Sequence, residues 1–296
     1  ISFEYGAKIP VDTLFASTGG GATNTAAAFA RLGLRTGIIS KLGKDTAAQH
    51  ILDELQHEDV DTSNIVCSTD HPTGYSVILT AFTGDRTVLV HRGACTHLRK
   101  DEVNWEALAN TKWIYLSSMA GPSAPLFEKV ALHARDHGVK LALNPGGTQI
   151  QQGLKALRPV FEATDAVFLN KEEAYELTGV EPRQGRDDEM QVLADLLDAG
   201  PDVVVMTDGP EGAEAHDGNA HYMVPAVPVE ELSTLGAGDA FAAGCIGALF
   251  HGLELRSALR AGALNAGNVI RYMDAKHGLL TWEQIQVQLA QGRRER

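Results

Sequence analysis

The chain contains 296 residues, 44% of them hydrophobic and 21% charged, which is the composition of an ordinary globular protein with enough residues for a sizeable core. This balance excludes disordered and fibrous classes. A formal net charge of −13 disfavours nucleic acid and anionic membranes as partners, because both carry negative charge and would be repelled. The expected partners are therefore small molecules.

The cysteines and the start of the chain bear on its location. Cys67, Cys95 and Cys245 lie far apart without a C-x-x-C pair, so we expect neither a disulfide framework nor a zinc site. No apolar run reaches the roughly 20 residues of a membrane helix, and no signal-peptide pattern is present. A cytoplasmic protein is expected. The chain opens at Ile1 without a methionine, so its first residues are expected to be missing.

Apolar runs with the period of strands alternate with runs that have the period of helices along most of the chain. Buried parallel strands are expected at 36–39, 113–116, 141–143, 166–169 and 203–206. Helices are expected at 24–32, 125–137 and 171–177, with a glycine just past each end. This alternation predicts the α/β class.

Two regions interrupt the alternation. Residues 74–80 and 86–91 flank the turn Thr83-Gly84-Asp85 and are expected to form an antiparallel hairpin apart from the parallel sheet. Residues 213–224 are expected to form a second hairpin at an edge of the main sheet. Because no internal repeat or linker is found, the sequence predicts one main domain, 1–296, with a small strand-built appendage.

The strongest local signal is the stretch 233–241, in which two glycines open an apolar helix. The backbone N–H groups of Gly236, Ala237 and Gly238 would point outward at a positive helix end, where they can hold a phosphoryl group. Asp239 beside such an anion site is costly unless it accepts a proton, as the base that activates a hydroxyl must do. The alternative is that Asp239 only complements the helix dipole.

Three further clusters are weaker signals. Gly20 and Gly21 let the backbone approach a ligand closely, and Asn24 can both donate to and accept from a sugar hydroxyl, unless it only caps the following helix. Two polar clusters, 170–173 and 207–212, follow predicted strands, at the edge where open α/β sheets bind ligands. A capping box between Asn170 and Glu173 is the alternative for the first cluster.

Several familiar sites are excluded by spacing. The chain has no G-x-x-x-x-G-K-[ST] P-loop, and both glycine clusters lack the third glycine of a dinucleotide fingerprint. It also has no G-x-S-x-G nucleophile elbow for covalent hydrolase chemistry.

Taken in order, the motifs resemble the ribokinase-like (PfkB) carbohydrate kinase family over nearly the whole chain. The glycines at 19–24 with Arg31-Leu32-Gly33 resemble its first signature, and 235–241 resembles its second. Asn170 and Glu173 match the N-x-x-E motif, and 41–45 lies where the family has its G-x-D. The resemblance implies a three-layer α/β/α domain with a β-sheet lid formed by about 1–18 and 73–92.

The resemblance also implies roles for these residues in a kinase that uses ATP and Mg²⁺. Asp239 is the implied catalytic base, and the amides of Gly236, Ala237 and Gly238 form the implied anion hole. The remaining roles are sugar binding by Gly20, Gly21 and Asn24, organisation of Mg²⁺ by Asn170 and Glu173, and nucleotide binding by Thr207, Gly209, Gly212 and Asn265, the last of them at the adenine.

Three departures from the family pattern limit what the resemblance implies. Ser233 stands where the family has an aspartate near a monovalent-cation site, so K⁺ is a doubtful cofactor. The family's first strand, with a sugar-gripping aspartate, has no counterpart before Tyr5. Gly21 replaces a lysine of some phosphosugar members, which disfavours a phosphorylated substrate.

Two alternatives remain beside a kinase for a sugar or sugar acid. One is a nucleoside kinase of the same fold, with Phe82 and Tyr75 as candidates for clamping the base. The other is a non-catalytic sugar sensor, which would not need all parts of a phosphoryl-transfer site. The apolar strands at 77–79 and 88–90 further suggest a homodimer formed through the lid.

Overall fold

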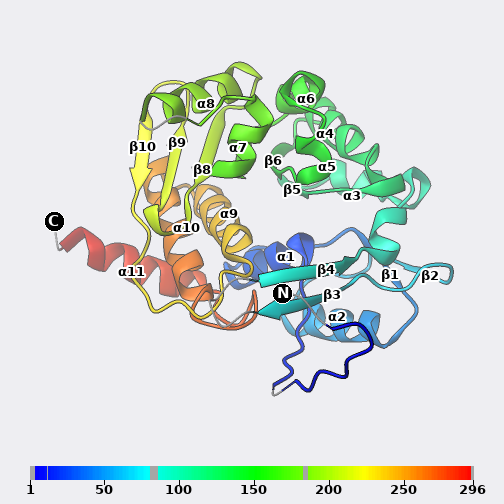
Figure 1. The fold of residues 1–296 in the computed structure, drawn as a ribbon. Helices are drawn as coiled ribbons and strands as arrows, with labels where there is room; N and C mark the ends of the chain where they lie inside the picture. Colours follow the sequence, from blue (N-terminus) through cyan, green and yellow to red (C-terminus); the bar gives the residue numbers. More distant parts are fainter. Residues whose placement is uncertain (1–3, 12, 81–85, 183–185, 295–296) are drawn as a thin grey trace.

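A six-stranded sheet organises the molecule, with the strand order β10-β9-β8-β7-β6-β5 (Figure 1). The computed structural model describes residues 4–11, 13–80, 86–182 and 186–294. Strands β5 to β8 run parallel, whereas β9 and β10 pair antiparallel at one edge. The strands are β5 Trp113–Ser117, β6 Lys140–Asn144, β7 Ala166–Asn170, β8 Val203–Thr207, β9 Ala213–His216 and β10 His221–Val224. The four later parallel strands and the edge hairpin expected from the sequence are thereby confirmed.

Helices cover both faces of this sheet and give the three-layer α/β/α architecture (Figure 1). One face packs against α4 Leu126–Asp136, α6 Leu154–Phe161, α7 Lys171–Thr178 and α8 Arg186–Asp198. The other packs against α9 Ala237–Phe250, α10 Leu255–Val269 and α11 Trp282–Arg294, with α1 Gly21–Arg31 lying on α9. The parallel strands are buried because each face sends apolar side chains into one of the two layers.

The expected helices are confirmed, with small shifts at their ends. Helix α1 begins three residues earlier than predicted, at Gly21, because Gly20 adopts a φ of 109° and opens the first turn. The described residues also form two short helices, α3 Trp105–Ala109 and α5 Gly147–Ile150, as well as α2, described below. Within the described ranges, none of the helices combines the length and the apolar character that crossing a membrane requires.

The strand expected at 36–39 is wrong as a member of the parallel sheet. Gly37 forms only a bridge to Asp61, and the strand begins later, as β1 Ser40–Gly43. β1 pairs with β2 Ile65–Ser68 in a separate two-stranded parallel sheet. The reason is local packing, since Ile38 is buried in a small cluster with residues of α1 and of α2 Thr46–His57 rather than in the main core.

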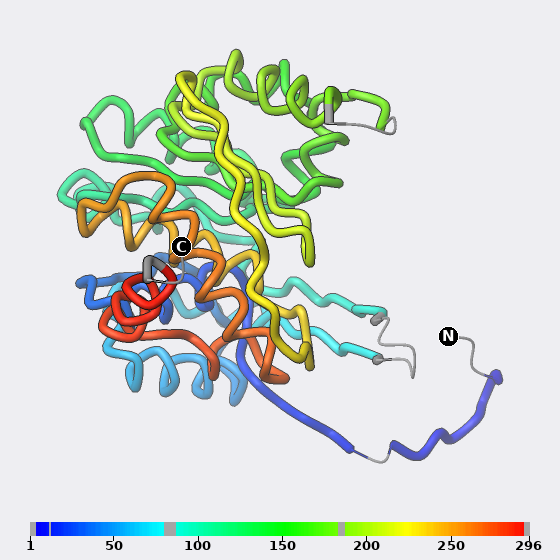
Figure 2. Tube along the Cα trace, turned by 90° about the vertical axis from the view of Figure 1, so that its left-hand side faces the viewer, coloured from blue at the N-terminus to red at the C-terminus, as the bar shows by residue number. Residues whose placement is uncertain are grey.

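A two-stranded lid extends away from the body of the molecule (Figure 2). β3 Tyr75–Thr80 and β4 Arg86–His91 pair antiparallel, as the sequence predicts, while the turn expected at 83–85 lies outside the described residues. Asp45, which caps α2, holds the base of the lid by accepting bonds from the Thr73 amide at 2.8 Å and hydroxyl at 2.7 Å. Residues 4–11 and 13–18 form no strand beside it.

Candidate functional site

The carboxyl ends of the parallel strands form one polar edge. Asn170 at the end of β7 is the register partner of Thr207 at the end of β8. Ser117 at the end of β5 is likewise the partner of Asn144 on β6. The two clusters expected from the sequence therefore lie on adjacent strands, at the edge where open α/β sheets bind ligands.

Helix α9 begins at this edge with an open turn of glycines. Gly236 caps the helix with a φ of 77°, and a Cβ on it would lie 2.9 Å from the Cα of Ala275. The amide of Ala237 donates to the Thr234 carbonyl at 3.2 Å. The amides of Gly236 and Gly238 have no acceptor among the residues that the structure describes. Two of the three predicted anion-hole amides are thus free to bind a ligand.

Asp239, in the first turn of α9, is bonded to the residue predicted to bind the sugar. The Nδ2 of Asn24 donates to the Oδ2 of Asp239 at 2.8 Å, across 215 residues of sequence. Burial raises the pKa of the Asp239 carboxyl above its ordinary value, and this bond works against the shift. A partly buried carboxylate of this kind is a better proton acceptor than an exposed one.

Asn24 is only 5% exposed, and the oxygen of its side-chain amide has no partner among the described residues. Its Oδ1 is buried without a hydrogen-bond partner in the described part of the chain, where no other side-chain polar atom is in this state. Leaving a buried acceptor unpaired is costly, so such atoms in native proteins ask for an explanation. A donor from a bound ligand would satisfy this oxygen. Asn24 lies within α1, whose cap is Gly20, so the alternative interpretation of Asn24 as the helix cap is wrong.

Ser117 is a site residue that the sequence interpretation missed. A Cβ on Gly21 would collide with the Oγ of Ser117 and lie 3.4 Å from the Oδ1 of Asp239. Gly21, Ser117 and Asp239 therefore meet at one point, from α1, β5 and α9. The rule that identified the polar residues after β7 and β8 would also have identified Ser117 after β5.

Asn170 and Glu173 form a capping box, the alternative to a ligand site at this cluster. The Oδ1 of Asn170 accepts from the Glu173 amide at 2.8 Å, and the Oε2 of Glu173 accepts from the Asn170 amide at 3.0 Å. Burial raises the pKa of the Glu173 carboxyl, and Glu172 and Glu176 add to the rise. A cation held nearby would stabilise the ionised carboxylate and offset the cost of its burial.

The oxygen atoms of Asn170 and Glu173 suit Mg²⁺ better than a metal that must take all its ligands from the protein. The described residues contain no cluster of three histidine, cysteine or carboxylate side chains able to hold a metal. Mg²⁺ is commonly bound by one or two carboxylates together with phosphate oxygens and water. The carboxylate of Glu173, close to the end of β7, is a group of this kind.

The residues expected to line the nucleotide follow β8. Gly209 and Gly212 have φ values of 48° and 101°, and a Cβ on Gly212 would collide with the Val224 carbonyl oxygen. Next to them, Lys171 pairs with Asp208 at 2.7 Å and with Glu189 at 2.6 Å. The connection between β8 and β9 is thus held close to the start of α7.

The side chain of Asn265, the residue predicted to face the adenine, is hydrogen-bonded inside the protein. Its side chain is 0% exposed, donates to the Ala240 carbonyl at 2.8 Å and accepts from the Leu280 amide at 2.9 Å. Both functional groups are engaged inside the protein, so the described contacts leave neither one to read an adenine. They instead fix the first turn of α9, next to Asp239.

A buried lysine and its neighbour connect the segment before the first glycines with the glycine turn that begins α9. Lys276 is 3% exposed, pairs with Glu54 of α2 at 2.7 Å and bonds to the hydroxyl of Thr18, just before the first glycines. The residue before it, Ala275, is the one that packs on Gly236. The first glycine segment and the start of α9 therefore share one support.

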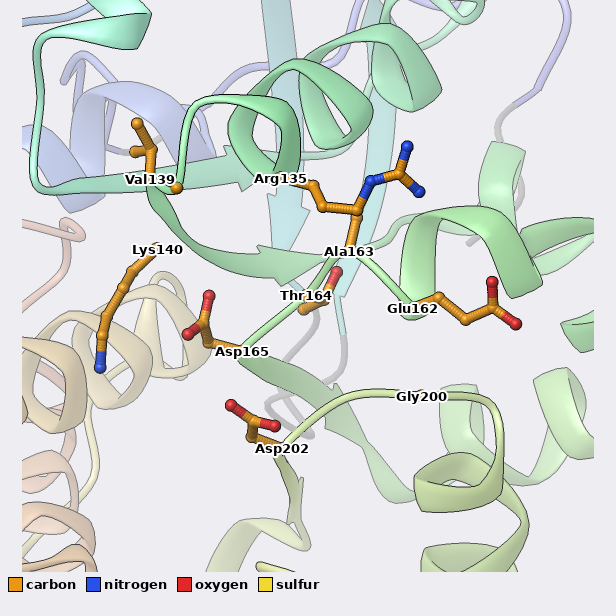
Figure 3. Close-up of a pocket in the computed structure, with 10 residues that line it drawn as sticks. Arg135, Val139, Lys140, Glu162, Ala163, Thr164, Asp165, Gly200 and Asp202 are labelled. Carbon is orange, nitrogen blue, oxygen red and sulfur yellow. The ribbon is translucent and has the colours of Figure 1, made fainter.

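A separate hollow of about 340 Å³ lies at the amino ends of the parallel strands, opposite the candidate site (Figure 3). Its lining includes Lys140, Asp165 and Asp202, at the amino ends of β6, β7 and β8. Burial and the charge of Asp202 raise the pKa of Asp165, which accepts a bond from the Leu141 amide at 2.7 Å. Because Asp239 lies at the opposite ends of the strands, this hollow is not part of the candidate site.

Comparison with known proteins identifies the family. A profile of the pfkB family carbohydrate kinases matches residues 2–282. The bifunctional ribokinase/ribose-5-phosphate isomerase A of Fructilactobacillus sanfranciscensis is 28% identical over 256 residues, which cover 84% of this chain and 45% of that longer protein. The 5-dehydro-2-deoxygluconokinase of Lacticaseibacillus casei is 26% identical over 294 residues, covering 95% of this chain and 89% of the relative.

Solved structures agree with this assignment. The crystal structure of adenosine kinase from Sinorhizobium meliloti matches with a TM-score of 0.79 and 25% identity, covering 92% of this chain and 83% of that one. The matched family profile extends over nearly the whole chain, from before the first glycine segment to beyond α10. The chain therefore belongs to the PfkB family of carbohydrate kinases and is a sugar kinase, a phosphotransferase of the ribokinase-like fold.

Proposed function

We propose that this kinase transfers the γ-phosphoryl group of Mg·ATP to a hydroxyl of a sugar or sugar acid, with Asp239 as the general base. The observation that carries the proposal is the bond between Asp239 and Asn24, which joins the phosphoryl side of the site to the acceptor side. The acceptor hydroxyl would lie against the Asp239 carboxylate, which takes its proton as the oxygen attacks.

On the phosphoryl side, the amides of Gly236 and Gly238 would hold the oxygens of the group in transfer, at the positive end of α9. Ala237 would join them only if its turn bond to Thr234 lengthens. When bound, Mg²⁺ would neutralise charge between the phosphates. Glu173 would hold it, and Asn170 would position Glu173 through the capping box.

On the nucleotide side, Thr207, Gly209 and Gly212 would line the ATP, beside Asn170. Asn265 is proposed as a positioning residue for α9 rather than as a contact of the base. A requirement for K⁺ is not proposed, since the Ser233 hydroxyl that replaces the family aspartate accepts from the Leu235 amide at 3.3 Å.

On the acceptor side, Gly20, Gly21 and Asn24 would hold the substrate. The unpaired Oδ1 of Asn24 favours an acceptor that offers a hydroxyl donor close to the reacting one, as a polyol or sugar does. Lys171 and Lys276 are already paired with carboxylates, so neither lysine is free to bind a substrate phosphate, which disfavours a phosphorylated substrate.

A nucleoside acceptor is the second candidate. The adenosine kinase of Sinorhizobium meliloti, which matches this chain, acts on such an acceptor by its name. Tyr75, 61% exposed on the lid, is available to contact a base, while Phe82 lies outside the described residues. A non-catalytic sensor is disfavoured, because the base, two free amides and a metal carboxylate occur together.

The proposal also covers the location and the oligomeric state of the enzyme. We place it in the cytoplasm, where ATP and sugars meet, and we propose a homodimer through the lid. Val77 and Leu89 are cross-strand partners on one face of the lid, 46% and 56% exposed, and a second copy would cover them. The lid, with residues 1–18 as its proposed second part, would exclude water from ATP.

The direct test of the proposed function is ADP release across a panel of sugars, sugar acids and nucleosides. We expect release that depends on one class of sugar or sugar acid and on Mg²⁺. Release with nucleosides alone would favour the second candidate. Tight binding of a sugar without any ADP release would refute the proposed reaction.

Replacing Glu173 with glutamine should raise the Mg²⁺ concentration needed for half-maximal activity about 10-fold or more, on the scale of losing a carboxylate ligand. Glutamine can still close the capping box, so α7 should remain intact. Activity titrated with Mg²⁺ measures the effect. The matched control is Glu172→Gln, which changes an exposed neighbour, and an equal shift in both variants would contradict a ligand role for Glu173.

Replacing Asn24 with alanine should move the acid limb of kcat/KM to higher pH. The base works only when ionised, so activity falls as pH drops through the raised pKa of Asp239. The Asn24 bond favours the ionised carboxyl, and its loss raises that pKa further. The pH profile of kcat/KM measures this shift, with exposed Asn219→Ala as control. A limb that stays in place would contradict the assignment.

A further inference from the structure

Lys276 belongs to a closed cluster of three polar side chains, which we call the Lys276 cluster. Its Nζ donates to the Oε1 of Glu54 at 2.7 Å and to the hydroxyl of Thr18. The Thr18 hydroxyl in turn donates to the Oε2 of Glu54 at 2.5 Å. Lys276 is only 3% exposed, and an ammonium group is costly to bury unless it is paired and hydrogen-bonded. The cluster satisfies this lysine with groups from two distant segments of the chain.

Thr18 is the point at which the segment before the first glycines is fixed. Among residues 13–20, Thr18 alone is not exposed. Within the described part of the chain, its side chain bonds only to Glu54 and Lys276. The two residues that follow are glycines, and the second of them, Gly20, opens α1. The cluster therefore sets where the glycines proposed to hold the acceptor begin.

The backbone beside Lys276 is in contact with the glycine turn that begins α9. A Cβ on Gly236 would lie 2.9 Å from the Cα of Ala275, the residue before Lys276. The same segment pairs with the chain that leads into the turn, because the Ile270 carbonyl accepts from the Leu232 amide at 2.8 Å. The position of the free amides in this turn therefore depends on the segment that carries Lys276.

The bend around Lys276 is itself fixed by hydrogen bonds. The Oδ1 of Asp274 accepts from the amides of Lys276 at 2.9 Å and of His277 at 2.7 Å, which is the pattern of an Asx turn. Three residues further on, the Leu279 carbonyl accepts from the Nη1 of Arg31, at the end of α1, at 3.1 Å. A displacement of the Lys276 side chain is therefore passed on to the neighbouring backbone instead of being absorbed by a loose loop.

We propose that Lys276 is a positioning residue, which holds the glycines of the acceptor side at a fixed distance from the amides at the start of α9. The inference rests on the proposed function, which places the two substrates at these two segments. Lys276 contacts neither substrate and exchanges no proton. Phosphoryl transfer requires the attacking oxygen close to the phosphorus and in line with it, and a displacement of about 1 Å can lower the rate about 10²-fold.

Lys276→Met removes the charge and keeps a side chain of similar length. We expect kcat to fall about 10- to 100-fold, because the two halves of the site lose their fixed spacing. The KM values of ATP and of the acceptor found in the panel should stay within about threefold, since each half keeps its own contacts. Steady-state kinetics with each substrate varied in turn measure this split. A rise in either KM at wild-type kcat would overturn the inference.

Thr18 variants test the same cluster without removing a buried charge. Thr18→Val keeps the shape of the side chain and removes its hydroxyl, so it should lower kcat in the same direction as Lys276→Met. Thr18→Ser keeps the hydroxyl and should recover most of that loss. Because the two residues act through one cluster, Lys276→Met combined with Thr18→Val should fall little further than Lys276→Met alone. Effects on kcat that simply multiply in the double variant would overturn the inference.

Lys41→Met is the matched control for a merely structural role. Lys41 of β1 is 5% exposed and pairs with Glu102 at 2.7 Å, and neither residue belongs to the candidate site. Both lysine variants should lose thermal stability, because each leaves a carboxylate without its cation, but only Lys276→Met should lose kcat. Equal kcat in the two variants would overturn the inference alone. A wild type that phosphorylates no acceptor would instead refute the proposed function beneath it.

Discussion

Asp239→Asn should lower kcat by roughly 10²- to 10⁴-fold, the contribution of a positioned general base. The variant keeps the shape of the side chain, and its amide oxygen can still accept from the Nδ2 of Asn24. We therefore expect the fold, and the affinity for ATP, to change little. Steady-state kinetics together with thermal unfolding measure both quantities in one preparation.

Asp165→Asn is the matched control for this variant. Asp165 is also a partly buried carboxyl with a pKa raised by burial, but it lies at the amino ends of the strands. Its replacement should leave kcat close to that of the wild type. If Asp239→Asn kept more than about a tenth of the wild-type kcat, Asp239 would not be the base.

Gly236→Ala should abolish most activity and lower the free energy of unfolding by about 2–5 kcal/mol. An alanine there would adopt a left-handed conformation, at about 1–2 kcal/mol, and its Cβ would collide with Ala275, which adds an overpacking cost of about 1–3 kcal/mol. The chain would have to move where the free amides of Gly236 and Gly238 lie. Denaturant unfolding and kcat measure the two effects.

Two companion variants make this prediction specific. Gly238→Ala adds a Cβ into open space at an ordinary φ, so its unfolding free energy should stay near that of the wild type. Adding Ala275→Gly to Gly236→Ala removes the colliding methyl group and should recover part of the lost stability. A double variant no more stable than Gly236→Ala would mean that this collision is not the cause.

The sequence was sufficient to predict the main sheet, because four buried runs and the helices between them each have a clear period. It failed at 36–39, where a buried run of the same kind packs on α2 instead of the main sheet. Periodicity indicates that a strand is buried but not which core buries it. The partner is decided by packing between residues far apart in the chain.

The site was predicted unevenly, for a related reason. Asp239, Asn24 and Glu173 belong to local motifs, and the structure brings Asp239 and Asn24 into contact. Asn265 was assigned a contact with adenine, whereas its side chain bonds inside the protein, because no local pattern distinguishes an inward amide from a ligand-facing one.

The destination of the γ-phosphoryl group tests the central claim most directly. With ATP labelled in that group and the acceptor found in the panel, the wild type should put the label on the acceptor in equal amount to the ADP formed. Asp239→Asn should put almost none there. Equal labelling of the acceptor by both proteins, or label only in inorganic phosphate with every acceptor, would contradict a sugar kinase with Asp239 as its base.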